Sequence, residues 1–168
     1  RLDKIIIATS NSDLDNPIEN LCLSENIAFY RGSLDDVLNR FINVADEYKA
    51  NVIVRLTGDC PLMDPDLIDE IVSEFLSSKL DYLSNCEPAT FPDGLDVEVF
   101  SYNALKDASI NASLPSQREH VTSYIRNNKD LFSIGNYESK KNYSNFRWTV
   151  DEPEDFELIS KIYEYLYP

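Results

Sequence analysis

Basic side chains are scarce in this sequence of 168 residues: 15 Lys and Arg stand against 30 Asp and Glu, which gives a formal net charge of −15. Binding to nucleic acid needs clustered Lys and Arg to neutralise phosphates, so this imbalance excludes nucleic acid as a partner. An anionic membrane surface is excluded for the same reason. A small anionic ligand fits such a sequence only where a bound cation or a few local basic groups offset the negative field.

The patterns of an exported or membrane-spanning protein are also lacking. The three cysteines (Cys22, Cys60 and Cys86) are odd in number and have no CxxC spacing, which indicates free thiols in a reducing compartment. No apolar run reaches the length of a transmembrane helix, and no signal peptide is recognisable. We therefore expect a cytoplasmic protein.

Internal repeats, low-complexity tracts and linker-like segments are absent as well. The length suits one domain whose core needs no disulfide or structural metal, and we predict a single α/β domain over residues 1–168. The chain begins with Arg1 rather than Met, and a strand pattern follows almost at once. We therefore expect that a further segment precedes Arg1.

The first half of the sequence alternates between strand and helix patterns. Short apolar runs predict buried strands at Lys4–Ser10, Ile27–Tyr30 and Asn51–Leu56. Apolar residues at helical spacing predict a helix through Ile18–Cys22, a helix that begins with a variant capping box at Ser33 and Asp36, and a helix that begins at Asp64-Pro65. This alternation predicts right-handed βαβ units and a parallel sheet.

The second half of the sequence does not continue this regular alternation of strand and helix patterns. Its predicted elements are a half-buried strand at Leu95–Phe100, helices at Tyr102–Ala112 and Ser116–Asn128, strands at Leu131–Tyr137 and Phe146–Val150, and a last helix at Pro153–Tyr165. The expected fold class is therefore α/β with a mixed, mostly parallel sheet. An excursion over about residues 85–137 carries apolar and aromatic side chains that the sheet does not need, so it forms either a satellite core or an interface.

Two aspartates follow predicted strands directly. Asp59 comes after the strand 51–56, at the sheet edge where open α/β folds bind ligands, and Gly58 lets a ligand approach the backbone there. Asp151 follows the strand 146–150. The alternatives are a plain turn for Asp59 and a helix N-cap for Asp151. Together, the two carboxylates suit a magnesium site, because Mg²⁺ combines one or two carboxylates with substrate phosphates.

Four further polar residues are candidate substrate ligands. Arg118 and the only histidine, His120, lie in a helix N-terminal segment that suits a carboxylate or a phosphate. Asp96 and Glu98 suit sugar hydroxyls. The alternatives are a surface Arg–Glu pair beside a partly buried histidine, and two carboxylates that simply face solvent.

Four segments occur in a specific order: VIVRLTGDCPLMDPDLID, FPDGLDVEVFS, QREHVTSYI and FRWTVDEPEDFELI. In this order they resemble the family that contains acylneuraminate cytidylyltransferases, CMP-KDO synthetases and the spore-coat polysaccharide protein F type, over about Ile5 to Leu158. The resemblance implies a Rossmann-like nucleotide-diphospho-sugar transferase fold. It also implies a reaction of CTP with a sugar acid that gives a CMP-sugar and pyrophosphate.

The resemblance assigns roles to particular residues. It implies that Asp59 and Asp151 are catalytic residues that bind Mg²⁺, and the neighbouring Thr57 and Gly58 are expected to bind substrate. It also implies that the segments 91–98 and 118–120 border the sugar and a homodimer contact. The chain has TGDCP where KDO enzymes have QGDEP, which places it nearer the spore-coat subgroup. The family's opening strand and its basic, glycine-containing phosphate loop would precede Arg1.

Two alternative functions stay open at this point. A glycosyltransferase that uses a nucleotide-sugar also needs acidic metal ligands, but normally as a D-x-D motif, which is absent where a strand would end. A non-catalytic sugar- or partner-binding module gains support if Arg1 is the native start, because half of the phosphate site would then be missing.

Overall fold

The computed structural model describes residues 2–166, which divide into two compact units. Unit 1 comprises the residues up to Ile53 together with Ser101–Ser133, and unit 2 comprises Val54–Phe100 together with the residues from Ile134 onward. Each unit therefore combines segments from both halves of the chain. The expected single domain over residues 1–168, with its excursion, stays a prediction.

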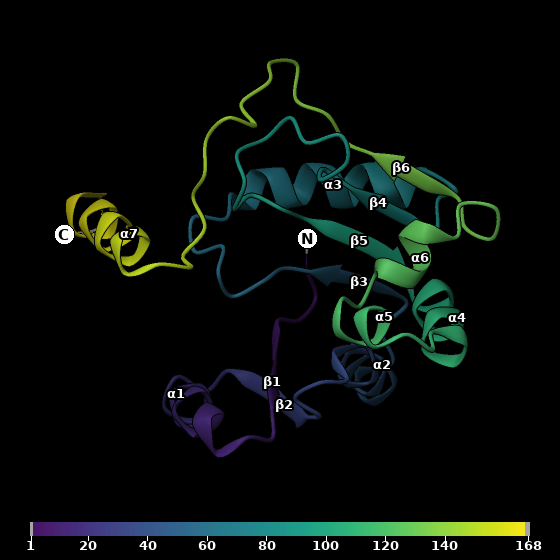
Figure 1. Cartoon of the computed structure of the whole chain (residues 1–168), viewed down its shortest axis with the longest axis horizontal. Coiled ribbons are helices and arrows are strands. Elements are labelled where there is room, and N and C mark those ends of the chain that lie inside the picture. The colour runs from purple at the N-terminus through teal and green to yellow at the C-terminus, as the bar shows by residue number, and fades with distance from the viewer. Residues whose placement is uncertain (1, 167–168) are drawn as a thin grey trace. The chain divides into compact units, whose positions relative to one another are not determined.

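Unit 1 is built around a pair of parallel strands (Figure 1). Its elements are β1 (Ile6–Ser10), a 3₁₀ turn (Asp13–Asp15), α1 (Asn16–Ser24), β2 (Ala28–Gly32), α2 (Val37–Tyr48), α4 (Tyr102–Asn111), α5 (Pro115–Glu119) and α6 (Ser123–Asn127). Both α1 and α2 contact β2, while α4 and α5 pack against α2 and are joined by α6. The predicted helix Ser116–Asn128 is therefore two short helices, interrupted at residues 120–122.

The helix α2 begins three residues later than the capping pattern predicts. The Asp36 carboxylate accepts a hydrogen bond from the backbone N–H of Asn39 (3.0 Å), so Asp36 is the N-cap. The Ser33 hydroxyl accepts from the N–H of Asp36 (3.1 Å), which forms a turn before the helix. Ser33 and Asp36 thus interact, as the capping pattern predicts. Their hydrogen bond closes a turn before the helix, and Asp36 is the residue that caps α2.

Unit 2 carries the larger sheet and its elements. They are β3 (Val52–Arg55, which begins in unit 1), α3 (Pro65–Ser77), β4 (Tyr82–Ser84), β5 (Glu98–Ser101), β6 (Ile134–Asn136) and α7 (Pro153–Leu166). The strand order is β3-β5-β4-β6, in which β4 is antiparallel to β5 and parallel to β6. The sheet is therefore mixed, as predicted. Asp64 caps α3 by accepting from the N–H of Asp66 (2.9 Å), and Pro65 occupies the first turn, which confirms the predicted start.

Three sequence predictions about the strands are wrong. The segment Phe146–Val150 is not a strand, since its pairing is limited to one parallel bridge between Arg147 and Asp93. The strand β5 is not half-buried, because Glu98 on its second face is only 5% exposed. Conversely, β1 is not buried on both faces within the described residues, where Ile7 is 37% exposed. Burial thus depends on neighbours that the alternation of residue types does not reveal.

Several apolar residues of the excursion are buried within the chain, whereas Ile110, Leu114 and Leu131 are exposed. Val97 and Val99 are 0% exposed, while Leu95 and Phe132 are each 7% exposed. The ring of Tyr124 packs edge-on against Phe132. These side chains act as core residues, so they provide no exposed surface for the expected dimer contact, and the homodimer stays a prediction. No helix between residues 2 and 166 is both long and apolar enough to cross a bilayer. The cytoplasmic location also stays a prediction.

We predict that Gly94→Ala lowers the free energy of unfolding by about 2 kcal/mol or more. Gly94 has a φ of +102°, and a Cβ there would lie 2.7 Å from the carbonyl carbon of Trp148, which is backbone and cannot rotate away. Urea unfolding followed by circular dichroism measures the change. The matched control is Gly58→Ala, where a Cβ would meet nothing within 4 Å and stability should not fall. Equal losses in both variants would contradict this account of Gly94.

Candidate active site

A backbone hydrogen bond brings the regions of Asp59 and Asp151 together in unit 2. The N–H of Val150 donates to the carbonyl oxygen of Asp59 at 2.8 Å, and Asp151 is the next residue along the chain. Both aspartates are exposed. The backbone next to Asp151 therefore contacts the backbone of Asp59 after β3, although Asp151 lies in an irregular segment rather than after a strand. A metal site shared by the two carboxylates stays a prediction.

The Asp151 carboxylate is held by its own segment. Its Oδ2 accepts from the Thr149 hydroxyl (3.0 Å) and forms an ion pair with Arg147. The start of α7 is capped by Asp155, whose Oδ2 accepts from the backbone N–H groups of Asp151 (3.1 Å) and Glu152 (3.0 Å). Hydrogen bonds from Arg147 and from these N–H groups lower the pKa of Asp155 to about 2. Asp155, and not Asp151, therefore has the capping role.

The turn that carries Asp59 is closed by Thr57 and Cys60. The N–H of Cys60 donates to the Thr57 carbonyl (3.3 Å), and the Cys60 thiol lies 3.2 Å from the Thr57 hydroxyl and 3.6 Å from Asp59 Oδ1. Burial, reinforced by the charge of Asp59, raises the pKa of the Cys60 thiol to about 11. Cys60 is therefore a neutral thiol at pH 7 that supports Asp59, and it is not a nucleophile. A Cβ at Gly58 would meet nothing within 4 Å, which leaves the backbone open to a ligand.

Asp96 and Glu98 have different environments despite their equivalent places in the sequence pattern. Burial raises the pKa of Asp96, and the charges of Asp93, Glu98 and Asp59 raise it further, so Asp96 belongs to the acidic group around Asp59. Glu98 is interior: its Oε1 accepts from the Tyr82 hydroxyl at 2.6 Å, and its Oε2 forms an ion pair with Arg55. A sugar hydroxyl would have to displace these partners, so Asp96 is the better candidate of the two.

Arg118 and His120 belong to unit 1. The Arg118 guanidinium donates two hydrogen bonds to the Asp36 carboxylate (2.9 and 2.7 Å) and one to the Ser109 carbonyl (2.7 Å). Although burial opposes it, hydrogen bonding from Arg118 lowers the pKa of Asp36. His120 is exposed at the C-terminal end of α5. Arg118 thus fastens α5 to the N-terminus of α2, and substrate contact by either residue stays a prediction.

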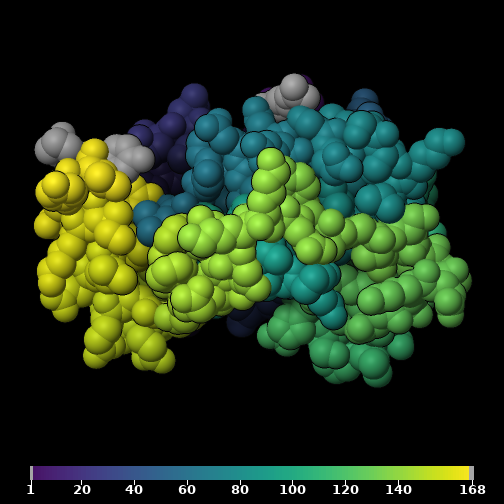
Figure 2. Space-filling model, turned by 90° about the horizontal axis from the view of Figure 1, so that it is seen from above, coloured from purple at the N-terminus to yellow at the C-terminus, as the bar shows by residue number. Residues whose placement is uncertain are grey.

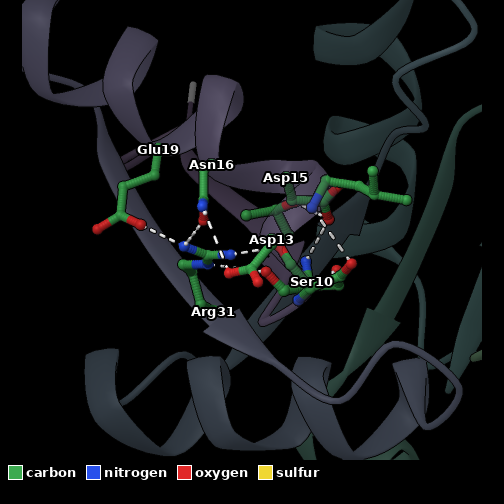
Figure 3. Close-up of polar contacts among 9 residues, drawn as sticks. Ser10, Asp13, Asp15, Asn16, Glu19 and Arg31 are labelled. Atoms are coloured by element: carbon green, nitrogen blue, oxygen red, sulfur yellow. Dashed lines mark hydrogen bonds and ion pairs between the residues drawn. The ribbon is translucent and has the colours of Figure 1, made fainter.

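A polar network that the sequence did not suggest holds the loop after β1 (Figure 3). Arg31 at the end of β2 donates to the carbonyl oxygens of Ser10 (2.8 Å) and Ser12 (2.6 Å) and to Asn16 Oδ1 (2.8 Å), and it forms an ion pair with Glu19. One guanidinium therefore fixes the path of the loop at the carboxyl end of a parallel strand.

Asp15 completes this loop from the opposite end. Its Oδ2 accepts from the Thr9 hydroxyl (2.7 Å) and from the N–H of Ser10 (2.9 Å). These hydrogen bonds from Ser10 and Thr9 lower the pKa of Asp15 to about 2. Both strand-end residues are thus tied to the start of α1, which gives unit 1 a rigid edge of the kind that open α/β sheets use for ligands.

A hollow of about 510 Å³ opens in unit 2 beside the Asp151 segment. It is lined by Leu62, Asp64, Phe91, Pro92, Leu95, Ser139, Tyr143, Phe146 and Trp148. In Figure 2, teal residues of the chain are framed by yellow-green residues of the 139–150 segment on this face. The sequence pattern does not reveal this hollow, because its walls come from four separate segments of the chain. The alternating aromatic residues of FRW are the available signal.

A metal ion here would depend on ligands from the substrate. Across residues 2–166, no group of three or more His, Cys, Asp or Glu side chains is arranged to hold a metal ion. Two exposed carboxylates nevertheless fit Mg²⁺, which commonly takes one or two carboxylates together with phosphate oxygens and water. Asp59 and Asp151 are thus suited to a metal that arrives with a phosphorylated ligand.

The mixed sheet flanked by helices is the fold of the nucleotide-diphospho-sugar transferases. A solved CMP:2-keto-3-deoxy-manno-octonic acid synthetase complexed with CTP matches 98% of this chain and 82% of its own at a TM-score of 0.69 and 13% identity, which shows the fold. The chain itself belongs to the cytidylyltransferase family, whose sequence model matches residues 1–167. The family and fold expected from the four sequence segments are therefore confirmed.

Several relatives are more similar in sequence. The uncharacterized protein MJ1063 of Methanocaldococcus jannaschii is 41% identical over 164 residues, which cover 96% of this chain and 66% of the relative. The spore coat polysaccharide biosynthesis protein SpsF of Bacillus subtilis is 36% identical over 165 residues (96% and 68%). The chain thus spans about two thirds of the length of these curated relatives. The solved structure of a cytidylyltransferase from Leptospira borgpetersenii is 32% identical, with a TM-score of 0.91 over 97% of this chain and 69% of that one.

We predict that Asp96→Asn stabilises the protein at pH 7 and that this gain disappears at about pH 3. The folded-state pKa of Asp96 lies above its unfolded value of 3.8, so folding is penalised once the pH exceeds that value and the carboxylate ionises. Below both pKa values the side chain is neutral in each state, and the penalty is absent. Urea unfolding at the two pH values measures the difference.

The control is Asp107→Asn, which removes one negative charge from an exposed position on α4. It corrects for the general effect of net charge on stability. A loss of stability in Asp96→Asn at pH 7 would show that the Asp96 carboxylate makes favourable contacts that outweigh its burial among other acids.

Proposed function

We propose that this protein is a nucleotidyltransferase that joins CTP to a sugar and releases pyrophosphate. The observation that supports the proposal is the backbone hydrogen bond from Val150 to Asp59, which brings the chain just before Asp151 to Asp59 in a member of the cytidylyltransferase family. The product would be a CMP-sugar for a surface polysaccharide or glycan, in keeping with the name of the spore coat relative. The family resemblance favours a sugar acid as the acceptor.

The reaction forms one bond and breaks one. The anomeric hydroxyl of the sugar attacks the α-phosphorus of CTP and releases its proton to water, and the bond from that phosphorus to the bridging oxygen breaks so that pyrophosphate leaves. Such chemistry requires positioning and charge neutralisation more than a protein nucleophile. This agrees with Cys60, a protonated thiol whose role is to support the Asp59 turn.

Asp59 and Asp151 would hold Mg²⁺, which when bound neutralises charge on the α-phosphate and on the departing pyrophosphate. Thr149 and Arg147 fix the orientation of the Asp151 carboxylate, and Arg147 would share that carboxylate with the ion. Gly58 leaves the backbone open for a phosphate. Because the chain carries a net charge of −15, a cation at this point also offsets its repulsion of CTP.

We predict that Asp59→Asn and Asp151→Asn each lower pyrophosphate release from CTP by about 100-fold or more, because each removes a charged ligand of the metal. The assay uses CTP, Mg²⁺ and a panel of sugars and sugar acids, in protein that includes any segment encoded upstream of Arg1. Chelation of divalent ions should abolish release, and added Mg²⁺ should restore it.

The matched control is Asp66→Asn, an exposed aspartate in the first turn of α3, which should retain activity. Calorimetry of Mg²⁺–CTP binding gives a second readout that needs no sugar. Full activity in the Asp59 and Asp151 variants, or CTP consumption that is insensitive to chelation, would refute the proposed metal site.

A further inference from the structure

Arg147 differs from the other paired arginines in how open its ion pair is. Its side chain is 43% exposed, and that of its partner Asp151 is 55% exposed. The side chains of Arg31, Arg55 and Arg118 are 20%, 24% and 22% exposed in their own pairs. An ion pair between exposed side chains contributes little free energy, because water screens both charges. Of the pairs that these four arginines make, the contact between Arg147 and Asp151 is therefore the easiest to exchange.

A second carboxylate keeps Arg147 in place. Its Nη1 donates to Asp155 Oδ1 at 2.8 Å, while its Nη2 pairs with Asp151. Asp155 is itself fixed, because its other oxygen caps the start of α7. The hydrogen bond from Arg147 is the largest cause of the low pKa of Asp155, about 2, so this carboxylate stays ionised and paired near neutral pH. Nη2 can thus change its partner while Nη1 remains on Asp155.

The Asp151 carboxylate has one oxygen that these contacts do not use. Both the Thr149 hydroxyl (3.0 Å) and Arg147 donate to Oδ2. Oδ1 takes part in neither contact, so it is the oxygen through which Asp151 would bind Mg²⁺. Metal binding there would draw negative charge away from Oδ2, and a guanidinium beside a divalent cation is also repelled by it. Occupation of Asp151 by the metal would therefore weaken its pair with Arg147.

A phosphate on the same ion offers Nη2 a new partner. Mg²⁺ in proteins combines one or two carboxylates with substrate phosphates and water. Arginine binds phosphate as well as carboxylate, because its planar fork suits both groups. The location agrees, since the N–H of Val150 binds the Asp59 carbonyl and so joins the segment that carries Arg147 to the chain just after β3.

We propose that Arg147 is a phosphate ligand that is released by metal binding: it holds Asp151 in the absence of metal, and moves Nη2 to a phosphate oxygen of the nucleotide when Asp151 binds Mg²⁺. Nη1 stays on Asp155 throughout. The inference rests on the proposed function for the identity of the ligand, a nucleoside triphosphate. Its consequence is that this acidic chain offers a guanidinium to the nucleotide only together with the metal.

The first test compares nucleotide binding with and without metal. Calorimetry measures CTP binding in Mg²⁺ and in excess EDTA, on protein that includes any segment encoded upstream of Arg1. In Mg²⁺, we expect Arg147→Gln to bind CTP about tenfold more weakly than the wild type, because a hydrogen bond between charged groups is lost. In EDTA the affinity should not fall, because Arg147 is still held by Asp151. An equal loss in both conditions is the result expected of a residue that only supports the fold, and it would overturn the proposal.

The matched control is Lys161→Gln. It removes the same charge from α7, where Lys161 pairs with Glu157 and both side chains are 67% exposed. CTP binding should be unchanged in Mg²⁺ and in EDTA. Circular dichroism checks that each variant is folded. If Arg147→Gln does not fold, Arg147→Lys replaces it, since lysine keeps the charge but has no fork to span Asp155 and a phosphate, and it should also lose affinity in Mg²⁺ alone.

Asp151→Asn gives a test of opposite sign. It removes the carboxylate that holds Nη2, so CTP binding in EDTA should become about threefold tighter, as the strength of an exposed ion pair predicts. The gain should be absent when Arg147→Gln is added to Asp151→Asn, and it should persist when Lys161→Gln is added instead. No gain, or a gain that survives Arg147→Gln, would contradict the role of Arg147.

The same measurements separate this inference from the proposed metal site. If Mg²⁺ does not strengthen CTP binding to the wild type, the metal site fails, and the Asp151→Asn series in EDTA still decides whether Arg147 binds the phosphates. If Mg²⁺ strengthens CTP binding by the same factor in the wild type and in Arg147→Gln, the metal site holds and the inference about Arg147 is wrong.

Discussion

The arrangement of unit 2 depends on a few backbone hydrogen bonds that hold residues 146–150 in place without a regular strand. Val150 is bonded to Asp59, while Phe146 and Trp148 are both bonded to Asp93. Gly94 makes this possible, since its positive φ and missing side chain let the backbone of Trp148 pass at a distance that any Cβ would block. The same contacts therefore bring the backbone beside Asp151 to Asp59 and place Trp148 in the wall of the hollow, so that the proposed metal site and the hollow share one support.

Electrostatics impose the second constraint. Four arginines of this acidic chain are committed to internal ion pairs: Arg31 with Glu19, Arg55 with Glu98, Arg118 with Asp36, and Arg147 with Asp151 and Asp155. These pairs shape loops and helix ends, so these four guanidinium groups are already neutralised by carboxylates. A divalent cation is the simplest source of positive charge for binding a phosphate to this acidic chain. The metal-binding role proposed for Asp59 and Asp151 therefore agrees with the net charge of the whole chain.

Much of the fold could be predicted where the signal is local. The cap and proline at Asp64-Pro65 determine the start of α3, and apolar spacing identifies the main helices, because these effects act within one or two turns. Prediction failed where burial depends on distant partners. Glu98 alternates with valines as a solvent-facing residue would, yet Arg55 and Tyr82, far away in sequence, supply the hydrogen bonds that let it be buried. The segment 146–150 has the composition of a strand but lacks a strand neighbour along its length.

The sequence by itself determined the family, the α/β class and the two aspartates that follow strand-like segments, because ordered motifs and local periodicity are properties of the chain alone. Only the tertiary structure decided which candidate residues are accessible to a ligand and which are engaged in internal ion pairs. It left Asp59, Asp96 and Asp151 exposed or partly exposed in one unit, committed Glu98 and Arg118 to ion pairs, and gathered Phe91, Tyr143, Phe146 and Trp148 around one hollow. The physical reason is that the state of a charged or aromatic side chain is set by the neighbours that folding brings to it, and most of those neighbours are remote in sequence.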